Sequence, residues 1–220
     1  MGDGGEVRIT AVEALARRRD RVALRFDGAE RIEVSAEVWA RTGLAVGAEV
    51  DAGEVTLLKR RDHAWQAREA ALRLLSYRSR STAELRRRLL RQDFEPEMID
   101  VCRAELRERG LLNDADFAAA WVRDRLRFRP RGRKGLLAEL RAKGVDAATA
   151  VAAIDEVRES DPDAEATLAR AAAAKWRPRP GEEPVRARRR IEHFLARRGF
   201  AADVVREAAA ARLAEVAPPE

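Results

Sequence analysis

Three segments of the 220-residue chain share one pattern of apolar residues, and this repeat limits the possible folds more than any other feature. Relative to Phe94, Val145 and Phe200, apolar residues recur five and nine positions earlier and five positions later. The matching residues are Leu89, Leu140, Leu195, Leu85, Leu136, Ile191, Ile99, Ala150 and Val205. Spacings of three and four residues indicate helices, and units of about 50 residues bury their apolar faces against one another. The sequence therefore predicts a mainly α protein with three tandem three-helix repeats stacked in an elongated array.

Each repeat is expected to contain a first helix, a basic second helix and a more acidic third helix. The first helices are expected at Trp65 to Ser76, Asp114 to Phe128 and Pro162 to Trp176. The repeats themselves are expected at residues 64–110, 113–158 and 161–216.

Several helix ends carry residues that satisfy the free backbone groups of a terminal turn. Ser81 to Glu84 has the form of a capping box, and Asn113 and the pair Asp161-Pro162 predict further helix starts. We interpret Asp114 and Asp116 as residues that cap the helix after Asn113, in preference to metal ligands. The expected helix stops are Gly110, Gly144 and Gly199.

Residues 1–60 differ from the rest and predict a small β-rich module in front of the repeats. Alternating apolar and polar residues, typical of half-buried strands, occur at Val7–Ile9, Val22–Phe26 and Ile32–Val34. Asp27-Gly28 stands between the last two runs and predicts a hairpin turn. A short helix within residues 38–44 and a weaker strand over residues 50–58 complete the expected module.

The distribution of charge is more informative than the net charge of +6. Residues 78–91 hold six basic and one acidic residue, residues 123–143 hold nine and two, and residues 175–198 hold nine and three. These windows run from the end of each first helix into the second helix, whereas the third helices are richer in acidic residues. The periodicity predicts a basic stripe along one side of the array, which suits a polyanion such as nucleic acid.

We interpret this stripe as a binding surface, because arginine forms bidentate contacts with phosphate. The alternative is a solvated face whose arginines pair with acidic residues on neighbouring helices. The residues assigned to the surface are Arg78, Arg80, Arg86, Arg87, Arg127, Arg129, Arg131, Arg133, Lys134, Arg141, Lys143, Arg177, Arg179, Arg186, Arg188, Arg189, Arg190, Arg197 and Arg198.

Three aromatic residues, Tyr77, Phe128 and Trp176, stand at the ends of the first helices beside the basic windows. Stacking on exposed bases is one role for such residues, but we assign all three to the core, where large aromatic side chains are more common. Sequence-specific reading of DNA by a helix-turn-helix is disfavoured, because the third helices are acidic.

No residue pattern predicts catalysis, a metal site or a cofactor. The run from Gly132 to Gly135 lacks the spacing of a phosphate-binding loop, and His63 and His193 have no partners at the spacing of metal ligands. Cys102 is flanked by apolar residues of a helix, and we interpret it as a core residue. We therefore expect that the chain is not an enzyme.

The single cysteine excludes an intramolecular disulfide and permits a reducing compartment. No apolar run approaches the roughly 18 residues that span a bilayer, and the N-terminus lacks the features of a signal peptide. We expect a cytoplasmic protein that does not bind membranes.

Several motifs resemble the RecX family, bacterial regulators of the RecA recombinase. The strongest matches are Ala70 to Leu85, which includes Ser76-Tyr77-Arg78, and Leu106 to Ala118, which includes Gly110-Leu111-Leu112-Asn113. Gly135 to Val145 is similar to the second repeat of that family, and the N-terminal hairpin resembles an extension that many members carry. The resemblance covers nearly the whole chain and is weakest in the third repeat, which three prolines interrupt between residues 177 and 184.

The resemblance implies a monomer without enzymatic activity or cofactor that binds the RecA filament. It also implies a curved array that lies in the filament groove, contacts single- or double-stranded DNA without strong sequence specificity, and suppresses ATPase, coprotease and strand-exchange activities of RecA. Two other functions stay open, namely a DNA-binding protein that acts without the recombinase and a helical scaffold for an unrelated protein.

Overall fold

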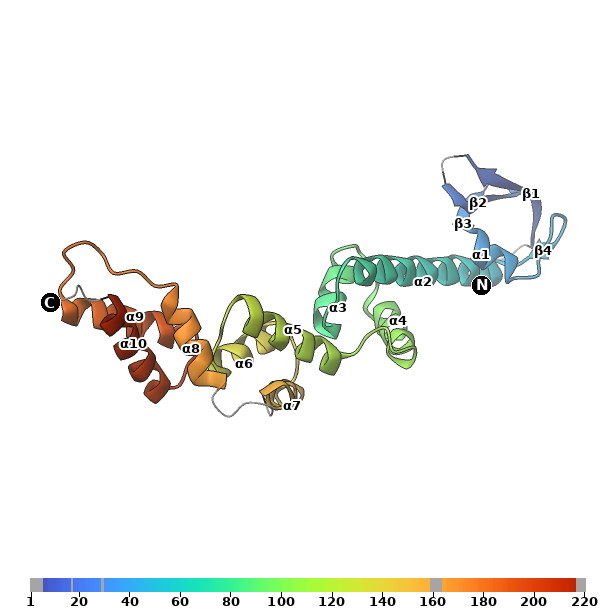
Figure 1. Ribbon diagram of the computed structural model, residues 1–220. Coiled ribbons are helices and arrows are strands. Elements are labelled where there is room, and N and C mark those ends of the chain that lie inside the picture. The colour runs from blue at the N-terminus through green and yellow to red at the C-terminus, as the bar shows by residue number, and fades with distance from the viewer. Residues whose placement is uncertain (1–5, 17, 29, 159–163, 217–220) are drawn as a thin grey trace. The chain divides into compact units, whose positions relative to one another are not determined.

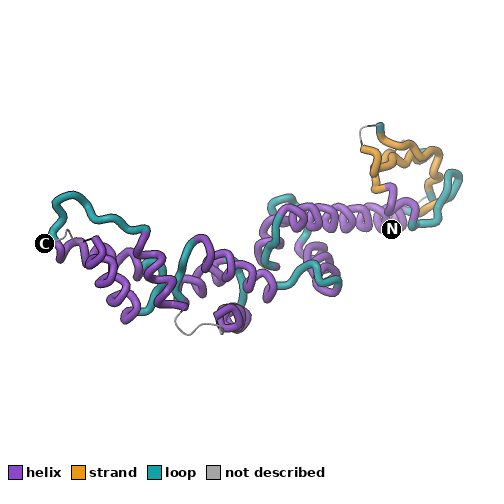
Figure 2. Tube along the Cα trace, in the orientation of Figure 1, coloured by secondary structure: helices purple, strands orange, loops and turns teal. Residues whose placement is uncertain are grey.

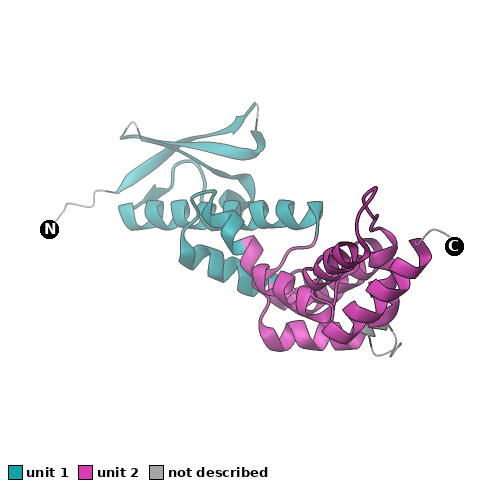
Figure 3. Cartoon of the chain, turned by 90° about the vertical axis from the view of Figure 1, so that its left-hand side faces the viewer, with its two compact units in different colours: residues 1–78, 86–106 teal, residues 79–85, 107–220 magenta. Residues whose placement is uncertain are grey.

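The computed structural model describes residues 6–16, 18–28, 30–158 and 164–216. The chain divides into two compact units (Figure 3), which we describe separately. The first unit comprises residues 1–78 and 86–106, and the second comprises residues 79–85 and 107–220.

Four antiparallel strands form the sheet of the first unit, in the order β3-β2-β1-β4. They are β1 (Val7–Leu15), β2 (Arg18–Phe26), β3 (Arg31–Ser35) and β4 (Glu49–Val50), with helix α1 (Ala36–Ala40) after β3. The hairpin predicted at Asp27-Gly28 joins β2 to β3, and in it Leu24 lies opposite Ile32. These two residues are buried with Ile9 and Val34, so the alternating pattern marks the core face as expected.

The strand predicted over residues 50–58 is wrong, because the strand ends at Val50 and helix α2 (Ala52–Tyr77) begins two residues later. Asp51 and Glu54 form a capping box at the start of this helix. Val55 and Leu58 are buried in the same core cluster as the strands, at the three-residue spacing of one helix face.

A buried carboxylate fixes α2 against the sheet. Asp62 is only 4% exposed, accepts a hydrogen bond from the backbone N–H of Ser35 at 2.6 Å, and pairs with Arg21 at 2.9 Å. The charge of Asp62 is thereby satisfied inside the unit by a guanidinium group and a backbone donor.

The three predicted three-helix repeats are confirmed (Figures 1 and 2). The first comprises the C-terminal part of α2 with α3 (Thr82–Leu90) and α4 (Pro96–Glu108). The second comprises α5 (Asp114–Phe128), α6 (Arg133–Ala142) and α7 (Ala147–Arg158). The third comprises α8 (Ala164–Ala174), α9 (Pro184–Ala196) and α10 (Ala202–Val216). The helix start predicted at Asp161-Pro162 lies outside the described residues.

The apolar residues that define the repeat form the helical cores. The six aligned leucine and isoleucine residues of α3, α6 and α9 are completely buried. They are Leu85, Leu89, Leu136, Leu140, Ile191 and Leu195. The predicted stops are also confirmed, since Gly110, Gly144 and Gly199 have φ values of +69°, +81° and +81°. A glycine with positive φ is typical of the residue that follows the end of a helix.

Candidate functional site

Helices α6 and α9 of the second unit meet through their backbones, end to end. The N–H of Gly132, the residue before α6, donates to the carbonyl of Arg198, which follows α9, at 3.0 Å. A Cβ atom on Gly132 or Gly135 would collide with the backbone at Arg198 and Gly199, and a Cβ atom on Gly199 would collide with the backbone of Gly135. This α6–α9 joint therefore requires glycine at three positions.

A corresponding joint connects α3 to α6. The hydroxyl of Ser81, the residue before α3, donates to the carbonyl of Lys143 at 2.6 Å. A Cβ atom on Gly144 would collide with the side chain of Ala83. In the repeat alignment Ser81 corresponds to Gly132 and Lys143 corresponds to Arg198, so the same positions form both the α3–α6 joint and the α6–α9 joint.

A second capping contact strengthens the α3–α6 joint. The carboxylate of Asp114 accepts from the backbone N–H of Thr82 at 2.7 Å, so Asp114 caps α3 and the expectation that it caps its own helix is wrong. Asn113 caps α5 as predicted, because its side chain accepts from the backbone of Ala115 and Asp116.

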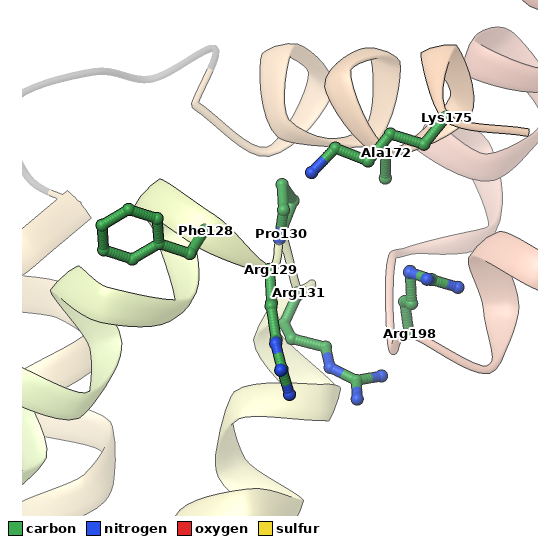
Figure 4. Close-up of a pocket in the computed structure, with 7 residues that line it drawn as sticks. All are labelled: Phe128, Arg129, Pro130, Arg131, Ala172, Lys175 and Arg198. Atoms are coloured by element: carbon green, nitrogen blue, oxygen red, sulfur yellow. The ribbon is translucent and has the colours of Figure 1, made fainter.

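An open pocket of about 390 Å³ adjoins the α6–α9 joint (Figure 4). It is lined by the C-terminal end of α5 and the loop that follows it, by the C-terminal end of α8 and by the second residue after α9. The lining residues are Phe128, Arg129, Pro130, Arg131, Ala172, Lys175 and Arg198. Four of these seven side chains are cationic and none is acidic, so we name this site the basic pocket.

The cations of the basic pocket are poorly compensated. Burial, together with the charges of Arg131 and Arg197, lowers the pKa of the Arg198 guanidinium group. Arg131 pairs with Glu139 at 2.9 Å, but Arg129, Lys175 and Arg198 have no acidic partner among the described residues. An excess of positive charge therefore remains beside the joint, as an anion-binding site requires.

Two cations of the basic pocket, Arg131 and Arg198, have counterparts at the α3–α6 joint, where Arg80 and Lys143 both interact with one carboxylate. Arg80 is 7% exposed and pairs with Glu84 at 3.1 Å, and Lys143 lies 3.9 Å from the other oxygen of Glu84. Arg80 therefore does not belong to an exposed binding surface, and its assignment to the basic stripe is corrected.

Eleven of the remaining residues assigned to the stripe fall into two groups. Six are exposed and have no acidic partner among the described residues, namely Arg87, Arg127, Lys134, Arg141, Arg189 and Arg197. Five pair with carboxylates, namely Arg86 with Asp100, Arg133 with Asp155, Arg186 with Glu183, Arg188 with Glu192 and Arg190 with Glu182. The basic windows are therefore partly paired internally and partly open to ligands.

Three further residues of the predicted stripe are exposed. Arg177 donates to the carbonyl of Ala174 at 2.6 Å, and Arg179 lies near the carboxylate of Glu182. Arg78 belongs to the first unit, as do Arg86 and Arg87, so the basic pocket does not include these three. Lys175 was not assigned to the surface, although its place in the third basic window is a usable signal.

The three aromatic residues at the helix ends differ from one another. Trp176 is 4% exposed, as expected for the core, and the guanidinium group of Arg190 lies 4.5 Å from its ring centroid. Tyr77 and Phe128 are 88% and 58% exposed, so the expectation that they belong to the core is wrong. The repeat pattern places these residues at helix ends but does not determine whether another element covers them.

The remaining candidate residues serve packing. Cys102 is 4% exposed, as predicted, and burial raises the pKa of its thiol to about 11. The ring of His63 packs against Phe94 with centroids 5.2 Å apart.

Among the described residues, no three His, Cys, Asp or Glu side chains form a group that could hold a metal ion. None of the described helices is long and apolar enough to cross a membrane.

These features define a tandem three-helix-repeat protein with end-to-end joints between second helices and a basic pocket beside one joint. The first, second and third three-helix domains of RecX match residues 67–106, 113–154 and 163–209 of the chain. These matches cover more than half of the sequence. The chain belongs to the RecX family.

Related proteins agree with this assignment. The regulatory protein RecX of Corynebacterium efficiens is 37% identical over 161 residues, which cover 69% of this chain and 75% of the relative. That of Mycobacteroides abscessus is 38% identical over 153 residues, which cover 66% of this chain and 72% of the relative. The crystal structure of a regulatory protein RecX superposes with a TM-score of 0.72 at 26% identity, covering 90% of this chain and 96% of the other. The chain is therefore a member of a family of regulatory proteins.

Proposed function

We propose that this protein binds the RecA filament and inhibits its ATPase, coprotease and strand-exchange activities, and thereby regulates recombination, DNA repair and the SOS response. Membership of the RecX family supports the regulatory role. The observation that carries the binding proposal is the convergence of Arg129, Lys175 and Arg198 at a pocket without an acidic side chain. In this proposal the pocket contacts nucleic-acid phosphate within the filament.

The proposed mechanism needs no catalysis by this chain. A filament of RecA on DNA repeats its protein and phosphate groups along one axis, and a chain of repeats contacts such a partner at several points. Each contact is modest, but contacts on one chain act together because the first raises the effective concentration of the others. Such attachment opposes the movements of RecA subunits during ATP hydrolysis, since the bound state is favoured over the states that break contacts. We propose that the protein acts as a monomer in the cytoplasm and without a cofactor.

The test is the rate of ATP hydrolysis by RecA on single-stranded DNA, measured against the concentration of this protein at two salt concentrations. The variant replaces Arg129, Lys175 and Arg198 by alanine. We expect at least about tenfold weaker inhibition, and a smaller dependence on salt, because each lost phosphate contact reduces the salt slope by about 1.

The matched control replaces Arg8, Arg25 and Arg170 by alanine. These exposed arginines lie outside the assigned surface and pair with Glu49, Glu13 and Glu207, so the control removes the same charge from sites that are locally neutral. We expect a much smaller change from the control. Equal inhibition by the pocket variant and the unsubstituted protein would overturn the binding assignment, and no effect of the unsubstituted protein on RecA would overturn the proposed function.

The basic pocket also suits a protein that binds DNA without RecA. The same titration distinguishes the two functions when binding to free DNA is measured in parallel. Tight binding of free DNA without a change in RecA activity would favour the stand-alone function, and neither binding nor inhibition would favour a scaffold for another protein.

A further inference from the structure

Two exposed aromatic residues occupy the same position in successive repeats. Tyr77 is the last residue of α2 and Phe128 is the last residue of α5, and they coincide in the repeat alignment. Each is followed by an exposed arginine, Arg78 in one repeat and Arg129 in the next. The pair of an aromatic residue and an arginine is therefore a repeated feature of the sequence, at the end of a first helix.

Packing does not account for these two rings. Tyr77 is 88% exposed and Phe128 is 58% exposed, although burial of an aromatic side chain is among the largest apolar contributions to folding. The third repeat has the same order, Trp176 followed by Arg177, but there the ring is 4% exposed. Trp176 lies two residues beyond the end of α8, where its ring is covered within the repeat, whereas the rings at the ends of α2 and α5 are exposed.

The surroundings of Phe128 indicate the chemistry of that ligand. The ring points away from the cations of the basic pocket, while Arg129, Arg131, Lys175 and Arg198 surround the pocket itself (Figure 4). The guanidinium group of Arg127 lies 5.0 Å from the centroid of the Phe128 ring. A flat apolar surface and a cationic pocket are thus adjacent at the C-terminal end of α5.

A ligand that matches both parts alternates flat apolar groups with anionic groups along a chain. Single-stranded nucleic acid has this composition, because its unpaired bases expose their faces and each nucleotide carries one phosphate. A duplex does not, because its bases stack on one another and present only their edges in the grooves.

We propose that Tyr77 and Phe128 are stacking platforms for unpaired bases of single-stranded nucleic acid, and that Arg78 and Arg129 contact the adjacent phosphates. This inference deepens the proposed function, and it rests on that function only for the assumption that the protein contacts nucleic acid. It assigns to the first two repeats equivalent subsites, which the third repeat lacks because Trp176 is buried.

The experiment measures binding of fluorescent oligothymidylate by fluorescence polarisation, with the full chain and without RecA. The variants are Tyr77→Ala, Phe128→Ala and the double substitution. Loss of one stacked base weakens binding by about 5- to 100-fold, so we expect about tenfold for each single variant and a larger loss for the double variant. The salt slope should stay unchanged, because stacking releases no counterions.

Two matched ligands separate stacking from phosphate contact. An abasic strand of equal length keeps the phosphates and lacks the bases, and a duplex of equal length hides the base faces. We expect the unsubstituted protein and the alanine variants to bind each of these ligands equally.

Matched variants separate stacking from the loss of exposed apolar surface. Tyr77→Phe and Phe128→Tyr keep an aromatic face and should retain the affinity for oligothymidylate. Val101→Ala and Val185→Ala remove exposed apolar side chains elsewhere, which are 68% and 63% exposed, and should leave binding unchanged.

The proposal is overturned if the alanine variants bind oligothymidylate as tightly as the unsubstituted protein, or if they lose equal affinity for the abasic strand. Because RecA is absent from this titration, either outcome leaves the proposed inhibition of RecA standing. Conversely, a protein that binds oligothymidylate through these rings but does not inhibit RecA would contradict the proposed function and retain the stacking subsites.

Discussion

The α3–α6 joint and the α6–α9 joint use the same repeat positions but differ in how their charges are compensated. At the α3–α6 joint, Glu84 lies between Arg80 and Lys143 and interacts with both. At the α6–α9 joint, Arg131 and Arg198 occupy the corresponding positions, and Gly135 stands where the alignment places Glu84. At the first joint one carboxylate compensates the two cations in part, whereas the second joint adjoins the basic pocket.

Steric constraint and charge are linked at the second joint. A Cβ atom on Gly135 would collide with the carbonyl of Arg198, so the close contact of the two helices excludes any side chain at this position. It therefore also excludes the carboxylate that would neutralise Arg198 as Glu84 neutralises Lys143. The difference teaches that one repeat architecture can use a joint for stability in one place and leave a joint available for a ligand in another.

The largest expected effect follows from removing the compensating charge of the α3–α6 joint. Glu84→Ala removes the carboxylate that pairs with the buried guanidinium group of Arg80, and we expect a loss of about 4 kcal/mol in the free energy of unfolding. Urea denaturation followed by circular dichroism measures this change.

Two controls accompany Glu84→Ala. Glu97→Ala removes an exposed carboxylate from the first turn of α4 and should cost about 0.5 kcal/mol. The double variant Arg80→Met with Glu84→Leu should regain most of the lost stability, because apolar residues of similar size can replace a buried ion pair. A loss for Glu84→Ala no larger than that for Glu97→Ala would contradict the role of Glu84 in the joint.

A smaller loss is expected when the α6–α9 joint is obstructed. Gly199 has a φ of +81°, and a Cβ atom there would meet the backbone of Gly135. Gly199→Ala should therefore lower the free energy of unfolding by about 3 kcal/mol, through backbone strain and overpacking together. Gly110→Ala is the matched control, since Gly110 has a φ of +69° but open space around it, and about 1 kcal/mol is expected there. Equal losses in the two variants would show that strain alone acts and that the close contact contributes nothing.

Much of the fold could be predicted because apolar periodicity and helix signals are local properties of a sequence. The residues aligned with Leu85 and Leu89 are buried in all three repeats, and Asn113 and Gly144 mark helix ends as expected. The start of α2 also has a local signal, since Asp51 and Glu54 have the spacing of a capping box. The apolar residues after them, however, fit a strand as well as a helix.

The candidate site depended on contacts between distant residues and could be predicted only in part. The basic windows contain the cations of the pocket, but Arg80 and Arg131 occupy the same repeat position and differ in burial. Arg80 is buried beside Glu84, whereas Arg131 lines the pocket while it pairs with Glu139. The exposure of Tyr77 and Phe128 was likewise not predictable, because hydrophobicity does not reveal which neighbouring element covers a ring.

The smallest expected effect is the difference in affinity for single-stranded DNA between alanine variants of the two corresponding cations, Lys143 and Arg198. Arg198→Ala should weaken binding about fivefold and reduce the salt slope by about 1, because it removes one uncompensated cation from the pocket. Lys143→Ala should leave binding nearly unchanged, since its ammonium group lies beside Glu84 and over the ring of Trp121.

The free energy of unfolding should rank the same two variants in the opposite order, with the larger loss for Lys143→Ala. Arg198→Ala relieves repulsion from Arg131 and Arg197, so we expect the free energy of unfolding to stay the same or to rise slightly. Lys143→Ala removes a partially exposed ion pair and should cost about 0.5 kcal/mol. If Lys143→Ala weakened DNA binding as much as Arg198→Ala, the carboxylate of Glu84 would not neutralise its joint, and the electrostatic difference between the joints would lose its basis.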